Sequence, residues 1–146
     1  MKKRIPLLLL LALVLIQLFP IDKKNPSIVA DQDLSASVPQ GQEAELLPLI
    51  KSACYDCHSH ETTFPRYTRF QPVGWWTKGH VKGGRNKVNF SIWGNYTDKE
   101  KTAKAQACAE VLSEKRMPPK SYAWMHPDAK LDNEARAAMV EFFNNL

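Results

Sequence analysis

Two cysteines and a histidine lie close together in the first half of this 146-residue chain, in the order Cys54-Tyr55-Asp56-Cys57-His58. Thiols three residues apart lie one helical turn apart, and each can add to one vinyl group of a single porphyrin. The adjacent imidazole can then bind the iron as its proximal ligand. The sequence therefore predicts one covalent haem of the c type, held by Cys54 and Cys57, with His58 on the metal.

Three other chemistries use the same residue types. A thioredoxin-like redox motif expects a βαβ setting, and no strand-rich run precedes Cys54. A zinc site could recruit Cys54, Cys57, His58 or His60, and Cys108, but structural zinc usually shows a second paired motif, and Cys108 stands alone. A disulfide between Cys54 and Cys57 would be cramped. The haem interpretation is favoured over all three.

The second axial ligand of the predicted haem is assigned to Met117. Methionine is a common partner of histidine in electron-transfer haem proteins, and Met117-Pro118-Pro119 follows a predicted helix in a loop that the prolines stiffen. Met139 lies on a helical stripe and is expected in the core, while His60 is expected as an exposed loop residue. An open sixth position is one alternative. The alternative ligands are Met125, His80 and His126.

Aromatic residues crowd the region between the motif and the next predicted helix, and they are expected to shield the porphyrin from water. Ordinary core packing is the alternative. They are Phe64, Tyr67, Phe70, Trp75, Trp76, Phe90, Trp93 and Tyr96. Trp75 and Trp76 are the predicted cofactor contacts among them. Arg85, which follows Gly83-Gly84, is the candidate partner for a haem propionate, with a solvated surface charge as its alternative.

The local patterns predict a small all-α fold with long loops. Thr97 to Glu100 forms a capping-box sequence that opens a helix through about Leu112, and Asp132 is the N-cap of a last helix. A further helix precedes Cys54, and Pro48 either starts it or kinks it. The predicted inner faces contain Leu46, Leu49, Ile50 and Ala53, then Ala103, Ala107, Cys108, Val111 and Leu112, and finally Ala135, Met139, Phe142 and Phe143.

The N-terminus has the form of an export signal or membrane anchor. Lys2, Lys3 and Arg4 precede an uncharged run, Ile5–Phe19, whose only polar residue is Gln17. Small residues suited to signal cleavage do not follow the run, so an uncleaved membrane helix within residues 1–21 is favoured, with the N-terminus inside and the body outside the cytoplasm. Residues 22–40 are interpreted as a tether, and residues 41–146 as the haem-binding domain.

The basic charge of the chain does not indicate a nucleic-acid partner. The formal net charge is +5, and the three basic residues at the N-terminus leave only +2 for residues 22–146. The remaining basic residues are interleaved with acidic ones. We therefore expect a nearly neutral exported body.

Several segments resemble the bacterial haem-binding-domain family of small exported single-haem proteins. The matching segments are Ser52–Ser59, Gln71–Trp76, His80–Arg85, Asn89–Trp93, Met117–Pro119 and His126–Leu131. The resemblance implies a cytochrome c-like helical fold around one haem, covalent attachment at Cys54 and Cys57, and iron on His58. It supports Met117 by position only, and it places the domain on the periplasmic side of a bacterial inner membrane.

The function expected from these observations is single-electron transfer by a membrane-anchored mono-haem c-type cytochrome. Methionine ligation leaves no open metal position, and no nucleophile–base pair is evident, so a carrier is favoured over an enzyme. Its partners would be redox proteins met transiently. The alternatives are a haem sensor or peroxidase-like protein with an open sixth site, in which His80 and Arg85 act as distal groups, and a haem-free domain stabilised by zinc or a disulfide.

Overall fold

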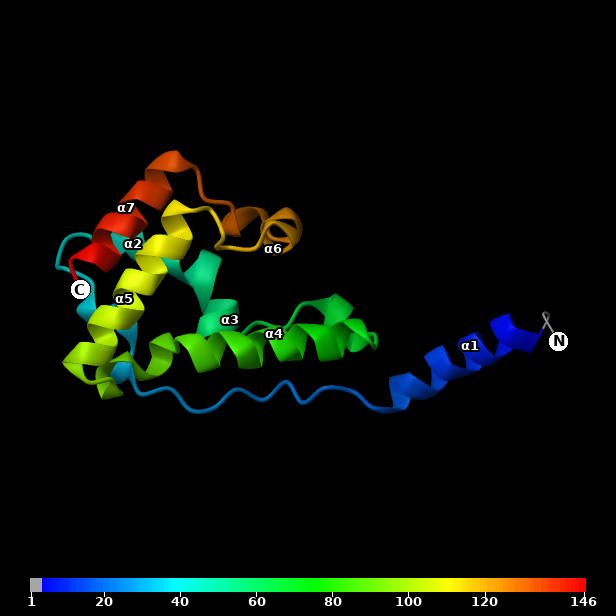
Figure 1. Cartoon of the computed structure of the whole chain (residues 1–146). Helices are drawn as coiled ribbons and strands as arrows, with labels where there is room; N and C mark the ends of the chain where they lie inside the picture. Colours follow the sequence, from blue (N-terminus) through cyan, green and yellow to red (C-terminus); the bar gives the residue numbers. More distant parts are fainter. Residues whose placement is uncertain (1–3) are drawn as a thin grey trace.

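The computed structural model describes residues 4–146, and this part of the chain contains helices and no strands, as predicted (Figure 1). Lys2 and Lys3, two of the three basic residues of the predicted export signal, lie outside the described residues. The α-helices are α1 (Arg4–Leu15), α2 (Glu43–Ile50), α3 (Asp56–His58), α4 (Val73–Lys87), α5 (Asp98–Ser113), α6 (Lys120–Met125) and α7 (Asn133–Asn144).

The core lies where α5 and α7 pack side by side, with α2 against α7 (Figure 1). Phe90, Phe143 and Met139 are among its largest fully buried side chains, so the prediction that Met139 belongs to the core is confirmed. Phe90 stacks on Phe143 and on Tyr55. The core therefore joins the last helix directly to the segment that holds the predicted haem motif.

Local capping signals placed the C-terminal helices correctly, but one predicted helix face was wrong. Thr97 and Glu100 form the capping box of α5, and Asp132 caps α7 by accepting a hydrogen bond from Ala135 N. Ala103 and Ala107, which were expected on the inner face of α5, are exposed. The buried residues of α5 are Ala105, Ala109 and Leu112, with the partly buried Cys108 beside them.

The capping box makes a pH-dependent contribution to stability. Hydrogen bonds from Thr97 N–H and its hydroxyl lower the pKa of Glu100 below its ordinary value of 4.5. Because the pKa of Glu100 is lowered in the folded state, its contribution to stability is fully present above pH 4.5. That contribution is lost as the pH falls through the folded-state pKa. We expect Glu100→Gln to reduce the urea midpoint of unfolding near neutral pH and to have little effect in acid. A loss of urea midpoint that is equally large at neutral and at acid pH would contradict the assignment.

The region after the motif, predicted as a long loop, contains the 15-residue helix α4. Its glycines concealed it, because glycine lowers helix propensity. Two of them have a packing reason. A Cβ on Gly74 would lie 2.5 Å from the Thr68 carbonyl oxygen, and one on Gly84 would lie 2.5 Å from the Cys57 carbonyl oxygen. The tertiary contacts of α4 therefore require glycines that the sequence pattern alone assigns to a loop.

The segment predicted as a tether, residues 22–40, contacts the folded domain at several separate positions. Residues 17–29, here called the N-terminal strap, run beside α4 (Figure 1). The side-chain amide of Gln17 donates to the Gln71 carbonyl and accepts from Gln71 N–H, at 3.0 and 2.8 Å. Farther along, Leu34 is fully buried and Val38 nearly so. Residues 30–38 therefore belong to the folded domain and not to a free tether.

The apolar N-terminal run is helical over a shorter stretch than predicted. The α-helix ends at Leu15, a 3₁₀ turn spans Ile16–Leu18, and no residue of α1 is buried. Among residues 4–146, no helix combines the length and apolar content that crossing a bilayer requires. The spanning helix expected within residues 1–21 is not found in the described part of that segment, residues 4–21.

Candidate haem site

The cysteine and histidine motif lies where one helix changes its winding. After α2, which continues through Pro48, a π-helical turn spans Lys51–Tyr55 and leads directly into α3. Wide turns of this kind occur often at functional sites. Cys54 lies in the π turn, while Cys57 and His58 lie in α3. All three cysteines of the chain are free thiols and partly buried, so Cys54 and Cys57 do not form the cramped disulfide considered above.

The ring of His58 is oriented by the end of α4. Its Nδ1 lies 3.1 Å from the Val88 carbonyl oxygen, an atom that can only accept a hydrogen bond. Nδ1 therefore carries the hydrogen, and Nε2 has the lone pair that a metal requires. Burial lowers the pKa of His58, an effect only partly offset by the nearby carbonyls of Val88 and Gly84. The neutral imidazole is thereby favoured.

The thiols of the motif are protonated at neutral pH. Burial raises the pKa of Cys54, with a further contribution from the nearby Cys108, and it raises the pKa of Cys57 to about 11. Catalytic redox thiols have lowered pKa values, so the thioredoxin-like alternative has no support here. Burial also raises the pKa of Cys108 to about 12, as expected for a small core residue. Within residues 4–146, no group of three or more His, Cys, Asp or Glu side chains is placed to hold a metal ion.

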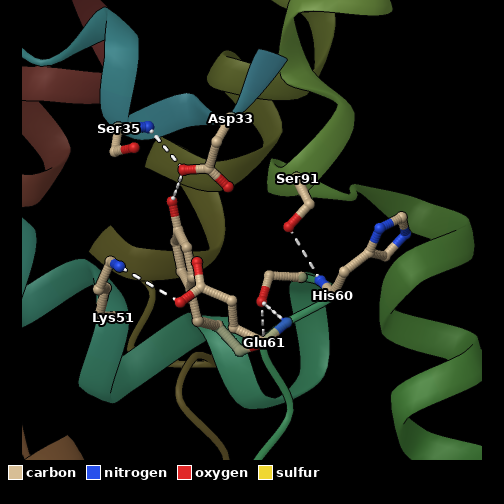
Figure 2. A network of polar contacts seen from close by, with 8 residues as sticks. Asp33, Ser35, Lys51, His60, Glu61 and Ser91 are labelled. Carbon is tan, nitrogen blue, oxygen red and sulfur yellow. Dashed lines mark hydrogen bonds and ion pairs between the residues drawn. The ribbon is translucent and has the colours of Figure 1, made fainter. Parts of the chain in front are cut away.

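A network of polar contacts fixes the motif to the surrounding chain (Figure 2). The buried Asp33 carboxylate accepts hydrogen bonds from Ser35 N–H and from the Tyr55 hydroxyl, at 2.9 and 2.6 Å. Lys51 pairs with Glu61 across the motif at 3.3 Å. The hydroxyl of Ser91 accepts from the backbone N–H of His60 at 2.9 Å. The segments before and after the motif are therefore held in place by side chains distant in sequence.

His60 lies outside the helices, as predicted for a loop residue, but it is half-buried and not exposed, and it is a structural residue of this network. Its Nδ1–H donates to the Ser27 carbonyl at 3.0 Å, and its Nε2 accepts from the Asn89 side chain at 2.8 Å. Both ring nitrogens are thus engaged by protein groups. The ring joins the N-terminal strap to the chain that follows the motif.

A partly open, mainly apolar pocket adjoins Cys57 between α4 and α6. Asp56 and Tyr122 tie its two sides together, since the Tyr122 hydroxyl donates to the Asp56 carboxylate at 2.7 Å. The same carboxylate accepts from Thr63 N–H at 2.8 Å. Aromatic and sulfur-bearing side chains supply part of the remaining wall, together with threonine, proline, valine and serine residues. They include Phe64, Tyr67, Trp76, His80 and Met125.

Of the aromatic residues predicted to contact the cofactor, some line this pocket and others lie elsewhere. Trp76 lines the pocket and packs against His80, with ring centroids 4.1 Å apart. Trp75 instead donates its indole N–H to the Phe19 carbonyl at 2.9 Å. Phe90 and Trp93 belong to the core and Phe70 is exposed. The aromatic residues therefore have three roles: some line the pocket, Trp75 bonds to the N-terminal segment, and Phe90 and Trp93 pack in the core.

Arg85 is held by protein acceptors. Its guanidinium donates to the Ser59 carbonyl, the Thr62 hydroxyl and the Asn25 side-chain oxygen, at 2.7, 2.9 and 2.8 Å. Burial lowers its pKa. These contacts connect the strap, α4 and the chain that follows the motif. A propionate contact by Arg85 stays a prediction, and its observed partners give it a structural role.

Of the candidates for the second axial position, the structure brings Met125 and His80 into the pocket beside Cys57. Met117 does not line that pocket; its carbonyl accepts a hydrogen bond from Arg136 at 2.7 Å. His126 stacks on Tyr122, with centroids 4.1 Å apart. The roles of Asp56, Tyr122 and Asn25 escaped the sequence reasoning, because each depends on a contact between residues far apart in the chain.

Comparison with known protein families agrees with this geometry. A family described as "Haem-binding domain" matches residues 11–145. The chain belongs to the haem-binding domain family. No curated protein and no solved structure matched it in the other two comparisons.

The donor set of this haem-binding domain fits a haem. His58 presents a neutral imidazole with its Nδ1 hydrogen-bonded, which is the form that ligates iron. Cys54 and Cys57 are free thiols one helical turn apart on the same segment. The pocket beside Cys57 is lined by aromatic residues. The family assignment makes this a haem protein and replaces the haem-free alternative.

Proposed function

We propose that this haem-binding domain is a mono-haem c-type cytochrome that carries single electrons outside the cytoplasm. The observation that carries the proposal is the pairing of two free thiols with a histidine whose Nδ1 is fixed by the Val88 carbonyl. Cys54 and Cys57 would hold the haem covalently, and His58 would bind its iron. When bound, the haem would supply a one-electron Fe(III)/Fe(II) couple.

The residues around the motif support a carrier that changes little on reaction. Asp33, Tyr55 and Ser59 are buried in the network that holds the motif, and Phe90 packs beside the His58 ring. A rigid setting of this kind suits electron transfer, because it keeps the ligand geometry the same in both oxidation states. Redox proteins met transiently remain the proposed partners, and nucleic acid is not among them.

The sensor or peroxidase-like alternative is favoured by one observation, the presence of His80 in the pocket. Its second proposed distal group, Arg85, is engaged by Ser59, Thr62 and Asn25. A carrier therefore stays the preferred proposal. Met117 is retained as the proposed sixth ligand from sequence, with Met125 and His80 as the competitors that line the pocket.

The proposal includes membrane association through the N-terminal segment. The side chains of α1 are all exposed, and most of them are leucine or other aliphatic residues. A contiguous apolar surface of this kind requires a cover, and lipid is the cover that fits a uniformly apolar helix. The location proposed for the folded domain is the periplasmic side of a bacterial inner membrane.

Covalent attachment is tested by haem staining after denaturing electrophoresis of protein made in an exporting host with c-type haem maturation. We expect wild type to retain haem and the Cys54→Ser/Cys57→Ser double variant to lose it entirely, because thioether bonds survive denaturation. Cys108→Ser is the matched control and should retain haem. Loss of haem from denatured wild type would refute covalent attachment.

The sixth ligand is tested by absorption spectra of the same protein. Methionine ligation gives the ferric form a far-red charge-transfer band, which Met117→Ala should abolish while Met125→Ala leaves it unchanged. If the band disappears in Met125→Ala instead, the ligand is the pocket methionine. Absence of the band in wild type, together with ready binding of CO by the ferrous form, would favour the sensor or peroxidase-like alternative.

A further inference from the structure

The strongest feature that the haem chemistry does not use is an exposed aromatic patch at the start of α4. It consists of Phe19, Phe70, Val73 and Trp75, whose side chains are 66%, 66%, 43% and 41% exposed. Large apolar side chains gathered on one surface mark an interaction site. Trp76 lies next to them but lines the pocket and is left out of the patch.

The patch is attached directly to the end of the apolar N-terminal run. Gln17, in the turn that follows α1, makes two hydrogen bonds with the backbone of Gln71. Two residues later, the Phe19 carbonyl accepts from the Trp75 indole N–H at 2.9 Å. The patch is therefore joined by hydrogen bonds to the turn that follows α1, and it lies at the end of α4 nearest α1 (Figure 1).

The charge of the chain is concentrated in the same region. Residues 62–97 contain no Asp or Glu, whereas residues 98–146 contain equal numbers of acidic and basic residues. Arg66 and Arg69, just before Phe70, are exposed beside the patch, and Lys82 and Lys87 are exposed farther along α4. Although the net charge of the body is close to zero, its positive charge is therefore unevenly distributed and gathers in residues 62–97. A positive, aromatic surface complements the anionic headgroups of a lipid bilayer.

We propose that this patch docks the folded domain onto an anionic membrane surface. This inference rests on the proposed membrane association of the N-terminal segment and extends it to the domain itself. Phe70 and Val73 enter the headgroup region, Trp75 lies at the interface, and the neighbouring Arg66 and Arg69 contact lipid phosphates. The strap along α4 then holds the domain in one orientation over the membrane. A free tether would allow every orientation.

The test uses the full haem-loaded chain reconstituted into vesicles that contain phosphatidylglycerol. Single cysteines are introduced as Phe70→Cys or Val73→Cys in the patch, and as Ile28→Cys or Val29→Cys in the strap. The control positions are comparably exposed, at 48% and 47%, but lie at the far end of the strap. Alkylation by a membrane-impermeant maleimide is followed by mass spectrometry of each cysteine peptide and normalised to the rate in unfolded protein.

We expect the patch cysteines to react on the order of tenfold more slowly than the strap cysteines, since buried apolar positions are removed from water. The difference should shrink in vesicles of phosphatidylcholine alone, which lack anionic headgroups. Equal rates at all four positions, in chains that float with the vesicles, would overturn docking while leaving membrane association intact. Protection that appears only on addition of a redox protein would make the patch a protein interface and would equally overturn the proposal.

A separate measurement tests the proposed haem function, independently of membrane docking. Haem staining of the denatured samples reports covalent attachment whether or not the domain docks. A chain that keeps its haem but leaves the vesicles would refute membrane association, and docking with it. The Soret spectrum of each cysteine variant confirms that the substitution has not disturbed the haem site.

Discussion

Replacing Phe90 by alanine should destabilise the domain by about 3–5 kcal/mol, the cost typical of deleting a buried aromatic ring. Phe90 is 2% exposed and lies at the centre of an aromatic cluster. Its ring centroid lies 5.8 Å from that of Tyr55, 6.0 Å from that of Phe143 and 6.0 Å from that of His58. One side chain therefore joins the last helix, the haem motif and the predicted iron ligand.

The loss is large compared with the whole stability of a small domain, which is usually about 5–15 kcal/mol. Urea unfolding followed by circular dichroism measures it. Phe70→Ala is the matched control, because it removes the same side chain from a position that is 66% exposed and should change stability by no more than about 0.5 kcal/mol. Similar losses in the two variants would show that the cluster around Phe90 does not form the core.

Sequence reasoning was most successful where a feature depends on a few neighbouring residues. The capping box at Thr97 and the Asp132 cap are local hydrogen-bond patterns, and both were confirmed. The haem motif is equally local, since its three predicted donors lie within five consecutive residues. The family match to the haem-binding domain agrees with that motif. Such features can be predicted because no distant contact is needed to form them.

The errors came from positions whose role is set by distant contacts. Alanine recurs at positions 103, 105, 107 and 109, so small residues occur around most of α5 and do not define its buried face. Residues 22–40 were interpreted as a tether because they contain prolines, serines and aspartates and show little apolar periodicity, while Gln17 was the one polar residue of the predicted membrane run. Asn25 and Gln17 instead bond to Arg85 and to Gln71, each more than fifty positions away.

The second axial ligand illustrates the same limit. Met117 was chosen because two prolines stiffen its loop, which is a local argument. The structure adds a pocket beside Cys57 whose wall includes His80 from α4 and Met125 from α6. Nothing in the neighbouring sequence shows that these two residues share one pocket. Their approach follows from the packing of two helices, one of which the sequence pattern concealed.

Helix α4, which the sequence pattern concealed, is the subject of the second prediction of a large change in stability. Gly84→Ala should destabilise the domain by about 1–3 kcal/mol, because the added Cβ would lie 2.5 Å from the Cys57 carbonyl oxygen and 3.1 Å from its carbon. These are backbone atoms of α3 and cannot rotate away. Helix α4 must therefore retreat from the haem motif, and the Val88 carbonyl that holds His58 lies only four residues beyond the substitution. We expect a smaller fraction of the protein to carry haem.

Gly83 provides a control at the adjacent position of the same helix. A Cβ there would have no neighbour within 4 Å, so Gly83→Ala meets no clash and should stabilise α4 by roughly 0.5–1 kcal/mol through helix propensity. The two variants have the same amino-acid composition, but the predicted changes in stability have opposite signs. Comparing them therefore separates the effect of close packing from the effect of helix propensity. If both variants stabilise the domain, α4 does not approach Cys57 closely in solution, and the orientation of His58 must come from another contact. If Gly84→Ala alone loses stability and haem together, the glycine is retained because α4 has to touch the motif.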